Sequence, residues 1–425
     1  MTAPRIVIVG GGIAGLLLAT GLGRKGQARV TLVDRSFTHV WKPMLHTLAA
    51  GTRDVQLQRV SFLAHAQRHG YAFEPGELVA LDRVARRVRL APLLAADGSV
   101  AVEARDLPYD WLVLALGSGI NDFGTPGVRT HAHAIDSQEQ AERFNTALRS
   151  QLLRAALHDT EVRVAIVGGG ATGVQLAAEL SQLMELASGF GDASMRRRLR
   201  LSLFESSPRL LAAFPERIAA ASQETLQALG FEIHTGTRVR SVSASGVDVA
   251  GLSHQRTHLT VWAAGVKAPD VLSGIGGLAS NGQQQLHVAP GLHSTGDERI
   301  FAIGDCASLR QGGSERQLPP TAQVATQQAQ HLVRHFPALL CGRKVPDFRH
   351  RDLGALVSLS RYSAYGTLGS AGVLPGHFLS GKVAQLGHDW LHRRHQAAVL
   401  GWARTGLLWA TEQLHLRALP PIRLS

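Results

Sequence analysis

The sequence predicts an α/β protein with two Rossmann-type dinucleotide-binding domains and a C-terminal amphipathic segment. Two observations predict the domains: a strand, glycine-rich loop, helix, strand and acidic residue follow one another from residue 5, and the same series returns from residue 163. A third predicts the segment, because tryptophan and basic residues gather after residue 376. With 425 residues, the chain is long enough for roughly three domains.

The first series begins with an apolar run at residues 5–9, which we expect to form a buried parallel strand. The loop that follows carries Gly10, Gly12 and Gly15 in the spacing G-x-G-x-x-G, and the second strand ends at Asp34. In such a unit the glycines let the backbone approach a pyrophosphate at a helix N-terminus. The acidic residue accepts hydrogen bonds from ribose hydroxyls. The series therefore predicts a dinucleotide site.

The second series starts with a strand at residues 163–167 and carries Gly168, Gly170 and Gly173 in the same spacing. Its next strand, residues 201–204, ends at Glu205. The acid lies further from its loop here, and we expect the insertion from Met184 to Arg198 to be a solvated loop. The internal duplication implies two dinucleotides in one chain.

Three more strands are expected to end at glycines: residues 109–116 at Gly117, residues 260–264 at Gly265, and residues 300–303 at Gly304 followed by Asp305. An acid after such a turn can bind a polyol hydroxyl, although strands commonly end this way. Residues 318–321 are expected to open a helix with proline near its first position. Gln323 and Gln327 then share one face of it, and a solvated amide pair is the alternative to a binding role.

Charge and composition exclude several classes. The net charge of +12 favours anionic partners, but no basic run is interleaved with aromatic residues, so nucleic acid is disfavoured. The only cysteines, Cys306 and Cys341, exclude a disulfide framework and a Cys₄ zinc site, and no metal site is predicted. Gly10 to Gly12 interrupt the uncharged stretch at residues 6–23, so no membrane-spanning helix is expected.

Residues 376–425 hold three of the six tryptophans and an excess of basic side chains. On a helical wheel one arc is apolar and the opposite arc is polar. The apolar arc comprises Val399, Trp402, Ala403, Leu407, Ala410 and Leu414. The polar arc comprises Arg404, Thr405, Thr411, Glu412 and His415. A basic amphipathic helix with tryptophans favours a membrane interface that contains anionic lipid. Packing on the core or on a second subunit is the alternative.

Two dinucleotide sites suggest electron transfer between a nicotinamide and a flavin. Glu205 favours NADH over NADPH because its carboxylate repels a 2′-phosphate, an effect that nearby Arg209 weakens. The chain resembles the type II NADH:quinone oxidoreductases, glutathione-reductase-like flavoproteins, and within them the enterobacterial membrane-bound form. The similarity runs essentially from end to end and includes residues 33–35, 39–46, 121–123, 262–269, 301–307, 320–328 and 354–360.

The resemblance implies noncovalent FAD, NADH as substrate, a membrane quinone and no proton pumping. It assigns FAD to Gly10, Gly12, Ala14, Gly15, Asp34, Arg35, Lys42, Pro43, Gly117, Gly304 and Asp305. It assigns NADH to Gly168, Gly170, Gly173, Glu205 and Gly265. The quinone is assigned to Gln323 and Gln327, in the motif A-Q-x-x-x-Q, with Lys382 as a weaker candidate.

One position departs from the family. The residue two places after the last glycine of the second loop is usually Glu, but here it is Gln175, which cannot carry a proton in a relay. Glu179, one turn further on, is a substitute candidate.

The resemblance also implies an organisation and a location. FAD-binding parts are expected at 1–158 and 291–345, an NADH-binding domain at 159–290, and a membrane, quinone or dimer segment at 346–425. The expected location is peripheral, on the cytoplasmic face of a bacterial inner membrane. A homodimer is left open. Three alternatives remain: a disulfide reductase, a sulfide:quinone reductase, and a non-catalytic NADH-binding flavoprotein.

Overall fold

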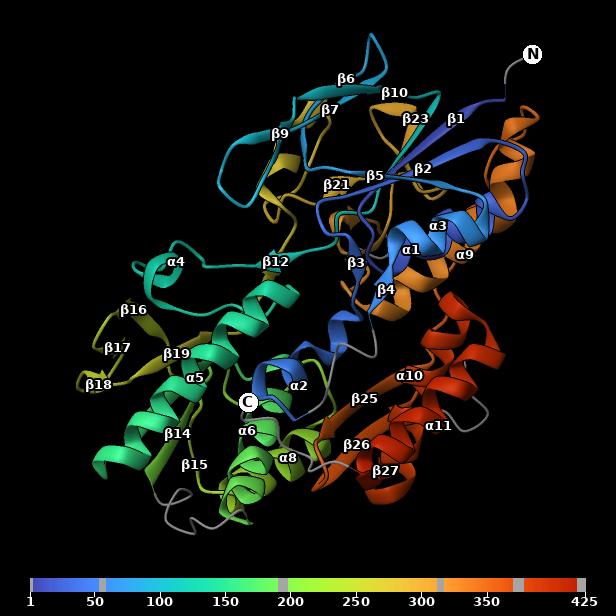
Figure 1. Cartoon of the computed structure of the whole chain (residues 1–425). Helices are drawn as coiled ribbons and strands as arrows, with labels where there is room; N and C mark the ends of the chain where they lie inside the picture. Colours follow the sequence, from blue (N-terminus) through green and yellow to red (C-terminus); the bar gives the residue numbers. More distant parts are fainter. Residues whose placement is uncertain (1–2, 53–58, 190–197, 312–316, 370–377, 419–425) are drawn as a thin grey trace. The chain divides into compact units, whose positions relative to one another are not determined.

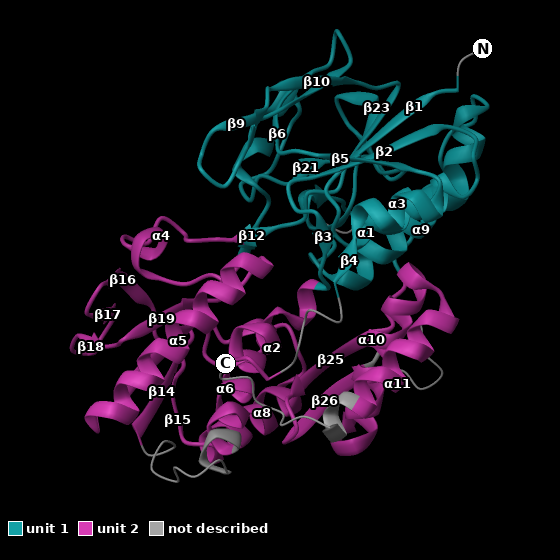
Figure 2. Ribbon diagram, viewed as in Figure 1, with its two compact units in different colours: residues 1–41, 59–119, 266–350 teal, residues 42–58, 120–265, 351–425 magenta. Residues whose placement is uncertain are grey.

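The computed structural model describes residues 3–52, 59–189, 198–311, 317–369 and 378–418. The chain divides into two compact units, which Figure 2 shows in different colours. Unit 1 comprises residues 1–41, 59–119 and 266–350, and unit 2 comprises residues 42–58, 120–265 and 351–425. Each unit holds one glycine loop. The domains expected from the sequence are defined by the ligand that each should bind, and their boundaries differ from those of the two units. These domains stay a prediction.

Unit 1 is built on a six-stranded sheet in the order β22-β23-β11-β1-β2-β5 (Figure 1). All neighbours in this sheet are parallel except β22 and β23. The strands are β1 (Arg5–Val9), β2 (Arg29–Asp34), β5 (Ala72–Pro75), β11 (Trp111–Leu114), β22 (His293–Ser294) and β23 (Asp297–Ala302). Because β1 is buried from its second residue onward, it forms the centre of the core, as its apolar run predicts.

Two helices of unit 1 carry the site. Helix α1 (Ile13–Gly23) starts directly after the first glycine loop and packs against α9 (Ala322–Leu340). A third, α3 (Phe62–His69), packs against β5. Unit 1 also contains an antiparallel sheet of β6 (Leu78–Asp82), β7 (Arg87–Leu90) and β10 (Arg105–Pro108).

Unit 2 repeats the arrangement with a four-stranded parallel sheet in the order β15-β14-β13-β19. Its strands are β13 (Val162–Val167), β14 (Leu199–Phe204), β15 (Phe231–His234) and β19 (Leu259–Trp262). Its helices include α2 (Leu45–Ala50), α5 (Gln138–His158), α6 (Ala171–Gly189) and α8 (Glu216–Ala228). A small antiparallel sheet contains β16 (Val239–Ser243), β17 (Gly246–Val249) and β18 (Gln255–Arg256). Both predicted Rossmann series are therefore confirmed as folded units.

The C-terminal part of unit 2 is an antiparallel sheet followed by two helices (Figure 1). The strands are β25 (Gly354–Leu359), β26 (Ser363–Leu368) and β27 (Phe378–Ser380), and the helices are α10 (Gly381–Leu400) and α11 (Trp402–Ala418). Helix α10 packs on β25 and β26, and α11 packs on α10. Among the helices that the structure describes, none combines the length and the apolar character needed to cross a bilayer.

Three details differ from expectation. Helix α6 continues to Gly189, and Met184 is buried, so the first part of the predicted solvated loop is wrong; residues 190–197 lie outside the described residues. Helix α9 begins at Ala322 with Thr321 as its N-cap, so the prolines precede the helix instead of standing at its first position. The helix is interrupted at Gly401, which has φ +87°. The residues of the predicted amphipathic arc are therefore divided between α10 and α11.

Candidate functional site

The first glycine loop uses its three glycines for different purposes. Gly10 has φ +107°, and a Cβ added to it would lie 2.3 Å from the carbonyl oxygen of Ala115. A Cβ on Gly15 would lie 1.9 Å from the carbonyl oxygen of Gly10. A Cβ on Gly12, in contrast, would meet no atom within 4 Å. The fold itself therefore requires Gly10 and Gly15, whereas Gly12 keeps open space at the N-terminus of α1, as a pyrophosphate requires.

The second loop repeats this geometry. Gly168 has φ +112°, and a Cβ there would lie 2.6 Å from the backbone of Ala263. A Cβ on Gly173 would lie 2.0 Å from the carbonyl oxygen of Gly168, and one on Gly170 would meet nothing within 4 Å. Two helix N-termini with the same open cradle fit two dinucleotides, one in each unit.

The two acidic residues make the same contacts. Asp34 accepts a hydrogen bond from the N–H of Gly11 at 2.5 Å and another, at 2.8 Å, from the N–H two residues after itself. Glu205 accepts from the N–H of Gly169 at 2.6 Å and from the N–H two residues after itself, also at 2.6 Å. Each carboxylate therefore lies between its glycine loop and the end of its strand, where a ribose adjoining the pyrophosphate would be bound.

The cations near these acids are engaged elsewhere. Arg209 donates to the carbonyl oxygens of Leu211 at 3.3 Å and Ala212 at 3.0 Å, so its guanidinium is held by its own loop. Arg35 lies 3.8 Å from Glu77, and both side chains are more than 60% exposed. A surface pair of this kind contributes little stability.

The ends of β11 and β23 meet at the carboxyl edge of the unit 1 sheet. Gly117 follows β11 with φ +67°, and the Ser118 hydroxyl donates to the Asp305 carboxylate at 2.7 Å. Gln285 donates to the backbone oxygen of Asp305 at 2.8 Å. This edge also carries the first glycine loop, so the Asp305 carboxylate is available to a polyol beside it.

Gln328 is a site-supporting residue that sequence reasoning missed. Its amide oxygen accepts from the N–H of Gly304 at 2.7 Å, and the side chain is only 1% exposed. A Cβ on Gly304 would lie 3.7 Å from that of Ala14, which is itself buried in α1. An amide on the buried face of α9, four residues after Val324, was the signal that could have revealed it.

The remaining nicotinamide and isoalloxazine candidates lie in unit 2. Lys42 forms an ion pair with Asp136 at 3.4 Å, and Pro43 follows it in a short 3-10 helix. Gly265 lies three residues after the end of β19 and has φ +68°, and a Cβ there would lie 2.5 Å from the ring of Phe123. Gly265 thus holds in unit 2 the position that Gly117 holds in unit 1.

Gln323 and Gln327 lie half-buried on one face of α9 in unit 1, so the prediction that they share a helix face is confirmed. The Gln323 side-chain oxygen lies 3.0 Å from Nε2 of His350. Gln175 is half-buried on α6, and Lys382 is exposed in the first turn of α10, both in unit 2. The structure therefore brings the two α9 glutamines together and places the other two candidates in a different unit.

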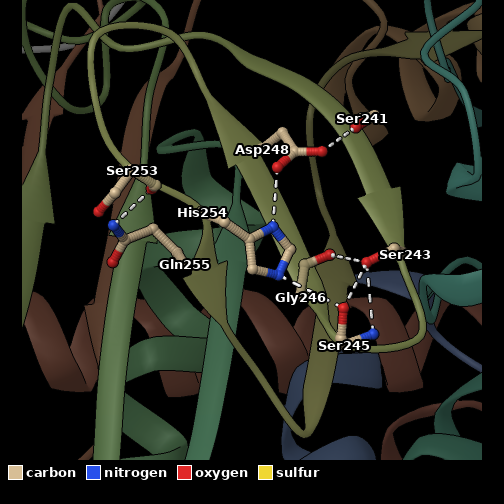
Figure 3. A network of polar contacts seen from close by, with 8 residues as sticks. All are labelled: Ser241, Ser243, Ser245, Gly246, Asp248, Ser253, His254 and Gln255. Carbon is tan, nitrogen blue, oxygen red and sulfur yellow. Dashed lines mark hydrogen bonds and ion pairs between the residues drawn. The ribbon is translucent and has the colours of Figure 1, made fainter.

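A polar network on β16, β17 and the following turn contains the residue types of an acyl-transfer triad (Figure 3). His254 Nδ1 lies 2.7 Å from Asp248 and its Nε2 lies 3.4 Å from the hydroxyl of Ser245. Ser241 donates to Asp248 at 2.6 Å. However, the Asp248 side chain is 52% exposed and that of His254 is 37% exposed, unlike the buried carboxylate of such a triad. The network connects β16 and β17 with the turn between them and with the segment that precedes β18.

The comparisons with known proteins agree with this geometry. The family model of the pyridine nucleotide-disulphide oxidoreductases matches residues 4–329. Among solved structures, NDH2 from Plasmodium falciparum in complex with NADH has a TM-score of 0.84 and 18% identity, over 99% of this chain and 100% of that one. The sulfide:quinone oxidoreductase of Aquifex aeolicus has a TM-score of 0.73 and 16% identity, over 98% and 96% of the two chains. At these identities the structures show the fold.

Curated sequences add closer relatives. A type II NADH:quinone oxidoreductase of Haemophilus influenzae is 38% identical over 99% of this chain and 99% of its own length. A protein of the same name from Staphylococcus aureus is 26% identical over 85% of this chain and 89% of its own. The predicted family is thereby confirmed: the chain belongs to the pyridine nucleotide-disulphide oxidoreductases and, within them, to the type II NADH:quinone oxidoreductases.

Proposed function

We infer that the protein oxidises NADH with noncovalently bound FAD and passes two electrons to a membrane quinone without pumping protons. The duplicated loop carries this conclusion, because both copies keep an open glycine at a helix start and an acid beside it. The identity of 38% to the Haemophilus influenzae protein over nearly the whole of both chains supports quinone as the acceptor.

When bound, FAD supplies the redox chemistry by accepting hydride from NADH and releasing two electrons to a quinone. The chain's contribution is binding. The loop from Gly10 to Gly15 and the N-terminus of α1 hold the pyrophosphate, Asp34 holds the adenosine ribose, and Asp305 holds the ribitol. Lys42 and Pro43 are the proposed neighbours of the isoalloxazine.

The same contacts in unit 2 support Glu205 as the residue that recognises the NADH ribose. We predict that Glu205→Gln raises the KM for NADH about fivefold. It should also lower the ratio of kcat/KM with NADH to kcat/KM with NADPH. An amide oxygen can replace only one carboxylate oxygen, so one of the two N–H contacts of Glu205 would be lost. Steady-state kinetics with both nucleotides measure this.

The matched control is Glu232→Gln, which removes an exposed carboxylate from β15 in the same unit. It should leave the selectivity for NADH unchanged. An unaltered selectivity ratio in Glu205→Gln would remove Glu205 from this role.

The quinone is proposed to bind at Gln323 and Gln327. Half-buried amides four residues apart can donate to a neutral quinone carbonyl. With Nε2–H of His350 donating to the Gln323 side-chain oxygen, the orientation of that amide is fixed and its NH₂ group points away from His350. His350 therefore prepares Gln323 as a hydrogen-bond donor.

Gln323→Ala and Gln327→Ala should each slow reoxidation of the reduced enzyme by quinone and raise the KM for quinone. Loss of one hydrogen bond to a neutral carbonyl corresponds to a change of roughly 2- to 12-fold. Anaerobic bleaching of the bound flavin by NADH should keep its normal rate, because it needs no quinone. Stopped-flow absorbance separates the two half-reactions.

Gln330→Ala, an exposed amide on the same helix, is the control and should alter neither half-reaction. If bleaching slows as much as reoxidation, the pair supports the flavin site or the fold. If neither changes, the amides are solvated side chains without a quinone role.

Gln175 offers a hydrogen bond but no titratable proton, so any proton relay on α6 needs another group. Glu179 lies one turn further along, is 6% exposed, and accepts a hydrogen bond from the hydroxyl of Thr52. We propose that Glu179 is the acid that carries the proton in place of Gln175.

The cysteines argue against the disulfide and sulfide alternatives. Burial raises the pKa of the Cys306 thiol to about 11, so it is not a thiolate at neutral pH. Cys341 is exposed after the end of α9, 35 positions further along the chain. A panel of ubiquinone and menaquinone analogues, sulfide and a disulfide, each with and without NADH, tests the assignment. Turnover with quinone and none with sulfur substrates is expected.

Membrane attachment is proposed through α10 and α11. Thr405 of α11 is 3% exposed and Glu412 pairs with Arg393 of α10, so these two residues of the polar arc face inward, whereas Arg404 and Thr411 are exposed. Trp402, Leu407 and Leu414 of α11 are each at least 66% exposed. We propose that this apolar face enters the interface of an anionic membrane on the cytoplasmic side. Lys382, in the first turn of α10, stays a weaker candidate for contact with the quinone. A homodimer through the same face is the competing proposal.

A further inference from the structure

The peptide of Gly11, in the middle of the first glycine loop, is held at both of its polar groups. Its N–H donates to Asp34 at 2.5 Å, and its carbonyl oxygen lies 2.9 Å from Nδ1 of His39. His39 is only 5% exposed, and burial lowers its pKa to about 4. The ring is therefore neutral at pH 7, and a neutral ring with its proton on Nδ1 donates to Gly11.

The second loop holds the equivalent peptide in the same way but with a different donor. The N–H of Gly169 donates to Glu205 at 2.6 Å, and its carbonyl oxygen accepts from the backbone N–H of Leu211 at 2.8 Å. A backbone group thus does in unit 2 what the His39 side chain does in unit 1. Because the carbonyl oxygen at this position is hydrogen-bonded in both loops, we infer that the contact is needed for the conformation that binds a dinucleotide.

Local structure fixes where His39 lies. It ends β3 (Thr38–His39), which pairs with β4 (Val60–Ser61) so that His39 lies opposite Val60. Phe62 follows immediately, and a Cβ on Gly11 would lie 2.3 Å from the Phe62 ring. In unit 2 the corresponding wall is Leu210, 2.5 Å from a Cβ on Gly169. The Gly11 peptide is therefore enclosed by a ring, a carboxylate and an imidazole.

We propose that His39 is a positioning residue for FAD, which holds the Gly11 peptide so that the N–H groups at the start of α1 face the pyrophosphate. This inference rests on the proposed binding of FAD by the first loop. His39 acts through the loop, so its loss should weaken FAD binding without altering the electron-transfer chemistry. Two titratable groups bear on this position: His65 on α3, which acts electrostatically on the His39 ring, and Asp34 at the end of β2, which accepts the N–H of Gly11.

The test compares three variants by dilution of the holoenzyme, with recovery of flavin fluorescence as the measure of FAD dissociation. His39→Phe keeps a ring but has no donor, and it should weaken FAD binding roughly 5- to 150-fold because a buried carbonyl loses its partner. His39→Asn places an amide nitrogen near the position of Nδ1 and should restore affinity to within about threefold of the original chain. His65→Phe is the control, since His65 contacts the Tyr71 hydroxyl at 2.9 Å instead of the loop.

Thermal unfolding of the flavin-free proteins separates positioning from packing. We expect both phenylalanine variants to lower the Tm to a similar degree, and only His39→Phe to lose FAD affinity. FAD affinity of His39→Phe within twofold of the original, or parallel loss of FAD affinity in His65→Phe, would overturn the proposal. If the original protein binds FAD but does not reduce quinone, the proposed function fails while this inference stands.

Discussion

Replacing Gly170 by valine should remove NADH binding from a protein that stays folded and keeps its FAD. A Cβ added to Gly170 would meet no protein atom within 4 Å, so we expect the fold to tolerate a side chain there. It would occupy the space that a pyrophosphate needs at the N-terminus of α6. Losing two charge-assisted hydrogen bonds to that group should raise the dissociation constant for NADH about 100-fold or more, as measured by anaerobic titration.

The duplication provides the matched control. A Cβ added to Gly12 would also meet no protein atom within 4 Å, and Gly12→Val should give a folded protein without FAD. Gly15→Val and Gly173→Val should instead impair folding, because their Cβ atoms would lie within 2.0 Å of a backbone oxygen. If Gly170→Val binds NADH normally, or if Gly12→Val keeps its FAD, the assignment of that loop to its dinucleotide is wrong.

The second large effect concerns the exposed apolar face of α11. Changing Trp402, Leu407 and Leu414 together to glutamine should reduce binding to vesicles that contain anionic lipid by roughly 1,000-fold or more, because burial of each apolar side chain contributes at least about 1.5 kcal/mol. Vesicle co-sedimentation measures this. NADH oxidation with a water-soluble quinone should continue.

The control exchanges Leu153 and Leu157 for glutamine. These side chains are 62% and 72% exposed on α5 of the same unit, so they match the apolar face in exposure but not in position. The triple variant could bind vesicles as well as the original protein and have half its molar mass in solution. That result would show that the apolar face forms a dimer and does not enter a membrane.

The sequence was sufficient for features that depend on local spacing. G-x-G-x-x-G between a strand and a helix fixes the turn, the helix start and the acid at the end of the next strand, so both loops could be predicted from a short window. The face shared by Gln323 and Gln327 also follows from helical periodicity.

Contacts between distant segments could not be predicted this way. His39 lies against Gly11 only because β3 pairs with β4. Gln323 accepts a hydrogen bond from His350, which lies 27 residues later in a segment without helix or strand. The break at Gly401 was visible as a glycine, but its effect depends on α11 folding back onto α10. That packing turns Thr405 and Glu412 inward and leaves the tryptophan face outward.

One chain should accept electrons from NADH and give them to a quinone in two separable steps. Anaerobic stopped-flow absorbance with one equivalent of each substrate tests it most directly. NADH alone should bleach the bound flavin completely, and a quinone added afterwards should restore the oxidised spectrum with formation of one equivalent of quinol. Bleaching that requires the quinone to be present, or a reduced flavin that quinone cannot reoxidise, would contradict the account.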